Sequence, residues 1–283
     1  MTPLYKITLP ESKGEVYAKM ERLNPTGTHK DRSLGPWILH YKKMGRNEFV
    51  ISSSGNSAVS AAKYCDEIGA VLHIFVGEKT DESKLAKIRA RENVFLNISK
   101  TPMKDAVRFS KERGLINLRS SKDDLALEGY KPIAYELQKE LPRVDNIFVP
   151  TSSGTTLEGI YLGFKDMGGR LPAFFAVQTA KLHPIAGYFD KDFVNEDSSY
   201  ATAIVDSIAY RRDRIKKIAK ETGGGGFVIS NKYLEDARKV LLKTGFKAFD
   251  AGWQSILSFA GFLKREKQGQ TRKGTVSVCI FTD

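Results

Sequence analysis

Short runs of β-branched and aromatic residues alternate along the chain with longer segments of helical periodicity, and this alternation limits the fold more than any other feature. The strand-like runs are 48–52, 71–76, 115–118, 146–149, 174–177 and 276–281. The helix-like segments are 57–68, 83–91, 104–113, 131–141, 157–167 and 233–244. Such alternation predicts parallel sheets joined by right-handed crossovers. Ligands of these folds bind beyond the carboxyl ends of the strands, so the strand-to-helix junctions are the candidate sites for chemistry.

Composition places the chain among globular proteins of one large domain or two moderate ones. Of its 283 residues, 41% are hydrophobic and 28% are charged, which is ordinary for a folded protein. No apolar stretch approaches the roughly 18–20 residues that cross a bilayer, and residues 1–10 lack the pattern of a secretory signal. The two cysteines, Cys65 and Cys279, match no metal spacing and suit a reducing compartment. We therefore expect a cytoplasmic protein without membrane partners.

The net charge of +12 raises nucleic-acid binding as an alternative. Lysines and arginines are scattered among acidic residues, and the densest basic cluster lacks the interleaved aromatics that stack on bases. That cluster comprises Arg211, Arg212, Arg214, Lys216 and Lys217. A basic surface, or attraction of a small anionic ligand, explains the charge equally well. We predict no nucleic-acid partner.

The first junction is Asn-Pro-Thr-Gly-Thr-His-Lys-Asp-Arg, residues 24–32. Its asparagine, proline and glycine form a turn, so Lys30 is predicted to open a helix. The positive end of a helix dipole favours the neutral amine, which is the form that makes a Schiff base with an aldehyde. Taken alone, Lys30 is more simply a surface lysine beside a helix cap.

Two further junctions are rich in serine, threonine and glycine. Residues 52–58, Ser-Ser-Ser-Gly-Asn-Ser-Ala, follow the strand-like run 48–52, and residues 150–159, Pro-Thr-Ser-Ser-Gly-Thr-Thr-Leu-Glu-Gly, follow the run 146–149. Small residues and hydroxyls at a helix N-terminus suit a carboxylate or a phosphate. Ordinary helix capping explains the first of them equally well. The second lacks the Gly-Lys-Ser/Thr of a P-loop and the glycine spacing of a Rossmann fingerprint.

Together, the three motifs, in this order and at these separations, resemble those of fold-type II pyridoxal-phosphate enzymes. Residues 2–4 with 16–21 resemble the opening hairpin of that family, and Ile280-Phe281-Thr282 resembles its final strand. The resemblance spans nearly the whole chain. It implies an α/β fold of two domains with open twisted sheets, like the tryptophan synthase β-subunit, that face a cofactor cleft. We expect residues 24–142 to form the smaller, mobile domain and residues 1–23 with 143–283 the larger, cofactor-binding one.

The resemblance also implies a role for each matching position, with pyridoxal 5'-phosphate as the cofactor. Lys30 would form the Schiff base and then move protons on the substrate. Asn56 would bond the ring hydroxyl, and Thr282 would face the pyridine nitrogen. The remaining roles are the substrate carboxylate site, formed by Ser54, Gly55 and Ser57, and the cofactor phosphate site, formed by Ser152, Ser153, Gly154, Thr155 and Thr156. No metal is implied, and His40, His73 and His183 are interpreted as structural because none has ligand spacing.

Within the family, the Asn-Pro-Thr-Gly-x-x-Lys-Asp-Arg and Ser-Ser-Gly-Asn-Ser-Ala motifs look most like threonine synthase, a lyase of amino-acid biosynthesis. The predicted reaction converts O-phosphohomoserine and water to threonine and phosphate. Arg32 and Ser57 are the candidates for the substrate phosphate. The alternatives are a cysteine synthase or a serine/threonine dehydratase with the same cofactor, and a non-catalytic relative. Family members usually form dimers, so we expect a homodimer. The phosphate loop departs from the family pattern, because relatives often have three or four glycines where this sequence has one.

Overall fold

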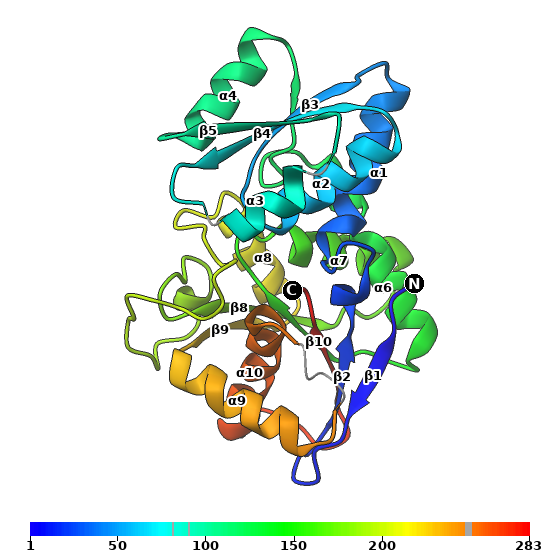
Figure 1. The fold of residues 1–283 in the computed structure, drawn as a ribbon. Coiled ribbons are helices and arrows are strands. Elements are labelled where there is room, and N and C mark those ends of the chain that lie inside the picture. Colours follow the sequence, from blue (N-terminus) through cyan, green and yellow to red (C-terminus); the bar gives the residue numbers. More distant parts are fainter. Residues whose placement is uncertain (81, 90, 247–250) are drawn as a thin grey trace. The chain divides into compact units, whose positions relative to one another are not determined.

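A computed structural model describes residues 1–80, 82–89, 91–246 and 251–283 of the chain (Figure 1). Its contacts divide the chain into two compact units. The large unit comprises Met1–Leu23 and Tyr130–Asp283, and the small unit comprises Asn24–Gly129. The division therefore falls at residue 129 instead of at the predicted 142. The physical reason is that helix α6 (Lys131–Glu140) buries Ile133 and Leu137 in a core of the large unit.

The large unit is built on a six-stranded sheet in the order β1-β2-β10-β7-β8-β9. Only β1 and β2 pair antiparallel, as the predicted opening hairpin requires; the other pairs are parallel. The strands are β1 (Leu4–Ile7), β2 (Glu15–Lys19), β7 (Asn146–Pro150), β8 (Ala173–Thr179), β9 (Gly225–Ile229) and β10 (Val276–Ile280). All five residues of β7, β9 and β10 are buried, which is typical of parallel strands covered on both faces.

Alternate residues of these strands enter two different cores. Phe148 and Cys279 pack with helices on one face, whereas Ile147 and Val278 pack with helices on the other, as the two-residue period of a strand requires. The first face is covered by α9 (Asn231–Lys243) and α10 (Trp253–Lys267). The second is covered by α6, α7 (Thr155–Met167) and α8 (Arg212–Glu221). Two short 3-10 helices complete the unit, η1 (Glu21–Leu23) and η2 (Ala186–Tyr188).

The small unit contains a wholly parallel sheet in the order β5-β4-β3-β6. Its strands are β3 (Glu48–Ser52), β4 (Val71–Gly77), β5 (Val94–Ser99) and β6 (Ile116–Asn117). Its helices are α1 (Lys30–Lys43), α2 (Asn56–Glu67), α3 (Glu82–Arg89), α4 (Pro102–Glu112) and α5 (Leu125–Glu128). Helices α1, α2 and α3 cover one face, and α4 covers the other (Figure 1). The predicted helix 83–91 is thus α3, although residue 90 lies outside the described residues.

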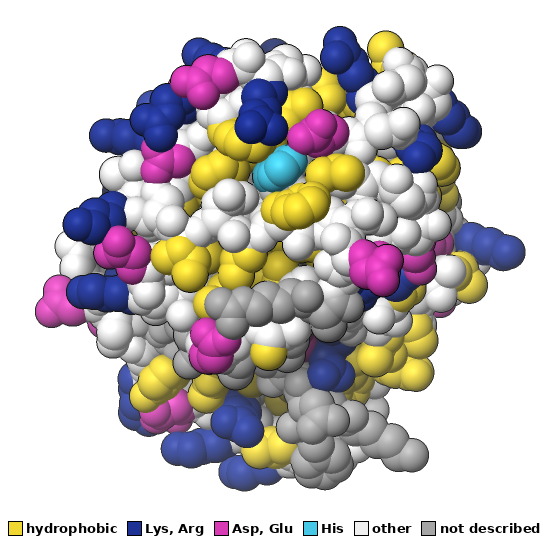
Figure 2. Space-filling model, turned by 45° about the horizontal axis from the view of Figure 1, so that its top comes forward, with side chains coloured by type: hydrophobic (Ala, Val, Ile, Leu, Met, Phe, Trp, Pro, Cys, Tyr) yellow, Lys and Arg dark blue, Asp and Glu magenta, His cyan; other side chains and the backbone are white. Residues whose placement is uncertain are grey.

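Hydrophobic side chains gather around a histidine on the face shown in Figure 2. On the α4 face of the small sheet, His73 stacks on Phe95, contacts Phe109, and bonds Glu48 Oε1 through Nε2 at 2.7 Å. These contacts give His73 a structural role.

Among the described residues, no helix is both long and apolar enough to span a bilayer.

The glycine run 223–226 permits close packing around strand β9. Only Gly223 has a left-handed backbone, with φ at +68°. Gly225 and Gly226 belong to β9 and are buried. A Cβ on Gly224 would lie 2.0 Å from Phe174 O, and one on Gly226 would lie 2.7 Å from Ala186 Cα. The run therefore lets β9 approach its neighbours closely.

Candidate functional site

Lys30 is the first residue of helix α1, as predicted from the turn that precedes it. Gly27 adopts a left-handed φ of +80° and donates its N–H to Asn24 O at 2.8 Å, which closes the turn. The Thr28 hydroxyl is buried and accepts the Lys30 N–H at 3.3 Å. The turn and the threonine therefore fix the backbone from which the half-buried Lys30 side chain extends.

Asp31 holds this turn against helix α2. Its Oδ2 accepts the Thr26 N–H at 2.7 Å, and its Oδ1 accepts the Thr26 and Ser60 hydroxyls, each at 2.6 Å. Asp31 and Ser60 are both buried. Burial raises the pKa of nearby Tyr64 to about 12, and the Asp31 charge adds to that rise. Ser60 was not among the predicted residues, because only the packing of α1 on α2 brings it to Asp31.

Replacing Asp31 by alanine is expected to destabilise the small unit by about 3 kcal/mol, because hydrogen bonds to a buried carboxylate are worth about 1.5–3 kcal/mol each and do not add fully. Ser60→Ala removes one of the three bonds and should cost about 1.5 kcal/mol. Trp37 and Trp253 are the two tryptophans of the chain, and Trp37 belongs to the small unit. Urea unfolding followed by Trp37 fluorescence in a Trp253→Phe background would measure both losses. Equal losses in the two variants would contradict a linking role for Asp31.

The serine-rich junction forms the N-terminus of α2, directly after β3. Gly55 is the N-cap residue and donates its N–H to Ser53 Oγ at 3.2 Å. No described atom lies within 4 Å of where a Cβ on Gly55 would stand, so there is open space beside this backbone. Asn56 is exposed, and Ser54 and Ser57 are half-buried. The predicted carboxylate ligands thus share one helix N-terminus, where N–H groups and the dipole favour an anion.

The third junction joins β7 to α7 through a tight turn. Gly154 caps α7 with a left-handed φ of +97°, and a Cβ there would lie 2.6 Å from Ile215 Cγ1. Ser153 Oγ and Thr155 Oγ1 lie 2.9 Å apart, and Thr155 and Thr156 are buried. The loop therefore has one glycine in the left-handed conformation, and the first turn of the 13-residue helix α7 carries two threonine hydroxyls at a helix N-terminus, which suits an anion.

Ser152, predicted as a phosphate ligand, is held by a second segment of the chain. Its Oγ donates to Asp206 Oδ2 at 2.7 Å and accepts the N–H groups of Val205 and Asp206, each at 3.2 Å. These bonds fix the start of the loop and place a carboxylate beside it. Asp206 was not predicted, because it lies 54 residues further along the chain.

A buried ion pair supports the same loop from within the large unit. Glu158, in the first turn of α7, accepts from Arg211 Nη1 at 2.8 Å and from Arg214 Nη1 at 3.2 Å. The Arg211 side chain is 3% exposed and that of Arg214 is 55% exposed. Two members of the basic cluster noted in the sequence therefore compensate one buried carboxylate.

Thr282 follows β10 and is buried. The preceding residue, Phe281, donates its N–H to Lys19 O at 2.9 Å and accepts the Arg22 N–H at 2.8 Å. Strands β10 and β7 are neighbours and run parallel. Thr282 and the phosphate loop are consequently at the carboxyl ends of adjacent strands, which is where such sheets bind ligands.

The structure thus brings the predicted residues together in two groups, one in each unit. Lys30 and residues 54–57 begin neighbouring helices of the small unit, linked by the Asp31–Ser60 bond. Residues 152–156 and Thr282 lie at one sheet edge of the large unit. Within the described residues, no group of three or more His, Cys, Asp or Glu side chains could hold a metal ion. The small unit supplies a primary amine at Lys30, and the large unit supplies the hydroxyl-rich start of α7 and the buried Thr282 hydroxyl. An amine for the aldehyde and hydroxyls at a helix N-terminus for the phosphate are the kinds of group that pyridoxal phosphate requires, so the residues present fit it.

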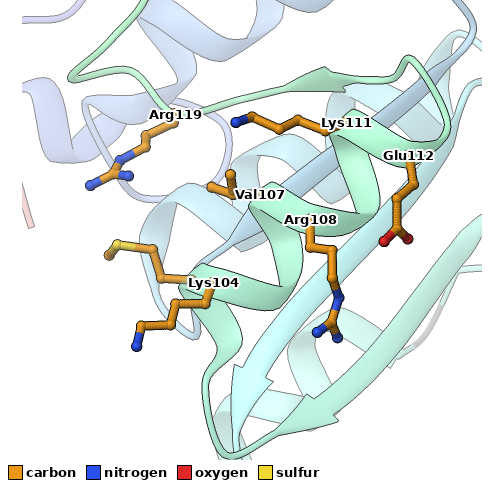
Figure 3. A pocket seen from close by; sticks show the side chains of 7 residues that line it. Lys104, Val107, Arg108, Lys111, Glu112 and Arg119 are labelled. Atoms are coloured by element: carbon orange, nitrogen blue, oxygen red, sulfur yellow. The ribbon is translucent and has the colours of Figure 1, made fainter.

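A shallow, open pocket on the small unit contains none of these residues. Figure 3 shows Lys104, Arg108 and Lys111 projecting from α4, with Arg119 beyond β6. Arg108 is already paired with Asp105 at 2.8 Å. This pocket does not contribute to the candidate site.

The curated relatives of this chain include several threonine synthases. That of Bacillus sp. (strain ULM1) is 25% identical over 276 residues, covering 95% of this chain and 77% of the relative. That of Methanocaldococcus jannaschii is 26% identical over 304 residues, covering 99% and 73%. An L-threonine ammonia-lyase of Thermotoga maritima is 28% identical over 173 residues, covering 60% and 43%.

Solved structures share the fold at lower identity. Threonine deaminase isoform 2 of Solanum lycopersicum gives a TM-score of 0.83 at 16% identity, covering 99% of this chain and 78% of that one. The O-acetylserine dependent cystathionine β-synthase of Helicobacter pylori gives 0.81 at 19% identity, covering 100% and 92%. These likenesses confirm the predicted fold-type II α/β class. A sequence model of the family described as "Pyridoxal-phosphate dependent enzyme" matches residues 1–283. The chain therefore belongs to the pyridoxal-phosphate dependent enzyme family, whose members use pyridoxal 5'-phosphate as their cofactor.

Proposed function

We propose that this protein is a threonine synthase, which converts O-phosphohomoserine and water to threonine and phosphate. The observation that carries the proposal is the extent of the sequence match. The threonine synthases named above align with 95% and 99% of the chain, whereas the ammonia-lyase aligns with 60%. The Asn-Pro-Thr-Gly turn that Asp31 fixes in front of Lys30 supports the same assignment.

Lys30 is the proposed acid–base residue. Bound pyridoxal phosphate supplies an aldehyde for amines and a ring that withdraws electrons. The Lys30 amine would hold the cofactor covalently and, once displaced by the substrate amine, would accept the substrate α-proton and then a β-proton. A lysine at a helix start is favoured in its neutral form by the dipole, and a neutral amine is what both tasks need. The γ-phosphate would then leave, a proton would return to Cγ to form the methyl group, water would add its hydroxyl at Cβ, and a proton would return to Cα to give threonine.

The large unit is proposed to hold the cofactor's phosphate and ring nitrogen. Residues 152–156 would bind the phosphate through the N-terminus of α7 and its hydroxyls. Thr282 would face the ring nitrogen. A neutral hydroxyl there leaves the nitrogen less firmly protonated than a carboxylate would, which suits elimination and replacement at the β or γ carbon.

The small unit is proposed to orient the substrate. Ser54, Gly55 and Ser57 would bind the α-carboxylate at the N-terminus of α2, while Asn56 would bond the ring hydroxyl of the cofactor. Arg32 and Ser57 are the candidates for the substrate phosphate. Holding the carboxylate fixes which substrate bond faces the acid–base lysine.

The test is a product assay with purified protein and added pyridoxal phosphate. We expect O-phosphohomoserine to yield threonine and inorganic phosphate in equal amounts. Serine and threonine should be assayed in parallel for ammonia, and O-acetylserine with sulfide for cysteine. Ammonia release from threonine, without turnover of O-phosphohomoserine, would replace the proposal by a dehydratase. That second candidate is favoured by the sequence match to the L-threonine ammonia-lyase of Thermotoga maritima. The threonine deaminase of Solanum lycopersicum has the same fold as this chain.

Two further expectations come from the family and are part of the proposal. We propose a homodimer located in the cytoplasm. Sedimentation equilibrium of the cofactor-loaded protein would measure the mass, and a single 31.6 kDa species would contradict the dimer.

Gly154→Ala is expected to weaken pyridoxal phosphate binding by at least roughly tenfold, or about 1.4 kcal/mol. A left-handed backbone costs a non-glycine residue about 1–2 kcal/mol, and the new Cβ would also displace Ile215. Gly168, at the other end of α7, is the matched control, because its φ is +72° but its Cβ would meet no atom within 4 Å. Titration of cofactor absorbance should show normal affinity in Gly168→Ala. The same affinity in both variants would argue against a close fit at the phosphate loop.

A further inference from the structure

The Asp283 carboxylate joins the end of β10 to the start of helix α10. Its Oδ2 accepts the Gly252 N–H at 2.9 Å, and its Oδ1 accepts the Ser255 N–H at 3.3 Å and the Ser255 hydroxyl at 2.7 Å. Arg22 Nε donates to the same Oδ2 at 2.6 Å. One carboxylate therefore receives four hydrogen bonds from two segments that are remote in sequence.

These bonds give α10 a cap that its own sequence lacks. The N-cap residue is Gly252, which has no side chain to accept an N–H of the first turn. Asp283, in the segment that follows β10, supplies that acceptor to Ser255, the third residue of the helix. The fit is close, because a Cβ on Gly252 would lie 2.7 Å from Asp283 Oδ1.

The same bonds restrict Thr282, which lies between two anchored residues. On one side, Phe281 donates its N–H to Lys19 O, at the end of β2, and accepts the N–H of Arg22 at its carbonyl oxygen. On the other side, the Asp283 side chain is held by Arg22 and α10. Arg22 serves both anchors, because its backbone N–H bonds Phe281 O and its guanidinium bonds Asp283.

We infer that the contacts of Asp283 with Arg22, Gly252 and Ser255, termed here the Asp283 clamp, position Thr282 for the ring nitrogen of bound pyridoxal phosphate. Asp283 acts as a positioning residue through Thr282 and does not touch the cofactor itself. This inference rests on the proposed role of Thr282 but not on the choice of substrate.

Charge compensation explains how a carboxylate can stand next to that hydroxyl. A carboxylate at the ring nitrogen would hold the nitrogen protonated, whereas a neutral hydroxyl does not. The guanidinium of Arg22 and the positive end of α10 both face the Asp283 carboxylate. The clamp thereby holds Thr282 firmly while its own negative charge is directed toward a cation and a helix dipole.

The test compares Asp283→Ala with Ser230→Ala. Ser230 caps helix α9 of the same unit by accepting the Tyr233 N–H at 3.2 Å, so its replacement removes a helix cap that has no contact with the clamp. Amide hydrogen exchange of the cofactor-free variants is the first readout. We expect exchange in residues 280–282 to accelerate at least tenfold in Asp283→Ala and to stay unchanged in Ser230→Ala.

The visible absorption and fluorescence of cofactor-loaded protein, without substrate, are the second readout. Asp283→Ala should shift the absorption maximum or change the fluorescence yield, Asp283→Asn should show a smaller change because one amide oxygen still accepts, and Ser230→Ala should match the wild type. Unchanged exchange at 280–282, or a wild-type spectrum in Asp283→Ala, would overturn the inference. Failure to turn over O-phosphohomoserine would affect the proposed reaction only, since neither readout uses a substrate.

Discussion

Lys30→Ala is expected to abolish the yellow absorption band that forms when the protein is mixed with pyridoxal phosphate, and to lower the turnover number by at least roughly 10²–10⁴-fold, the usual contribution of a general acid–base group. Lys30 opens α1, and its backbone is fixed by Thr28 and by the turn closed at Gly27. Alanine keeps this helix start but removes the amine. Borohydride should bleach the wild-type band and attach the cofactor to the peptide that contains Lys30, which mass spectrometry would identify.

Lys43→Ala is the matched control for this experiment. Lys43 is an exposed residue in the last turn of the same helix, so the variant removes one ammonium without altering the helix start. Its band, borohydride product and turnover should equal those of the wild type. A borohydride product on another lysine, or a wild-type band in Lys30→Ala, would remove Lys30 from the proposed mechanism.

The sequence predicts those parts of the site that a contiguous motif encodes. The turn before Lys30, the serine-rich start of α2 and the glycine at the start of α7 are each local, because one short segment supplies both the backbone conformation and the functional groups. The buried runs 48–52 and 146–149 likewise identify β3 and β7 nearly residue for residue.

The supporting contacts could not be predicted in this way, because their partners are distant in the chain. Asp31 meets Ser60 across 29 residues, Ser152 meets Asp206 across 54, and Arg22 meets Asp283 across 261. No periodicity or turn signal connects such positions; only the packing of helices and strands does. The domain division shows the same limit. Helix α6 has the amphipathic pattern of any surface helix, and its pattern does not say which core it covers.

Glu158→Ala is expected to destabilise the large unit by about 3–5 kcal/mol, because breaking a buried ion pair by removal of one partner is strongly destabilising. The group that loses this ion pair is Arg211, whose side chain is 3% exposed. Arg211 Cβ also lies 3.4 Å from where a Cβ on Gly154 would stand, so its displacement should loosen the phosphate loop and weaken cofactor binding. Urea unfolding followed by Trp253 fluorescence in a Trp37→Phe background would measure the stability of the large unit, to which Trp253 belongs.

Arg214→Ala separates the buried contact from the exposed one. Arg214 bonds the same carboxylate at 3.2 Å, but its side chain is 55% exposed. Exposed pairs contribute about 0–1 kcal/mol, so Arg214→Ala should lower the stability of the large unit by no more than that.

The double variant Glu158→Met with Arg211→Met should recover most of the lost stability, since a buried pair can often be replaced by apolar residues of similar volume at little cost. It should not recover cofactor affinity if the Arg211 guanidinium itself shapes the phosphate loop. Recovery of both stability and cofactor affinity in the double variant would mean that Arg211 only fills space next to Gly154. A loss of stability in Arg214→Ala as large as that in Glu158→Ala would show that the exposed arginine, and not the buried one, stabilises Glu158.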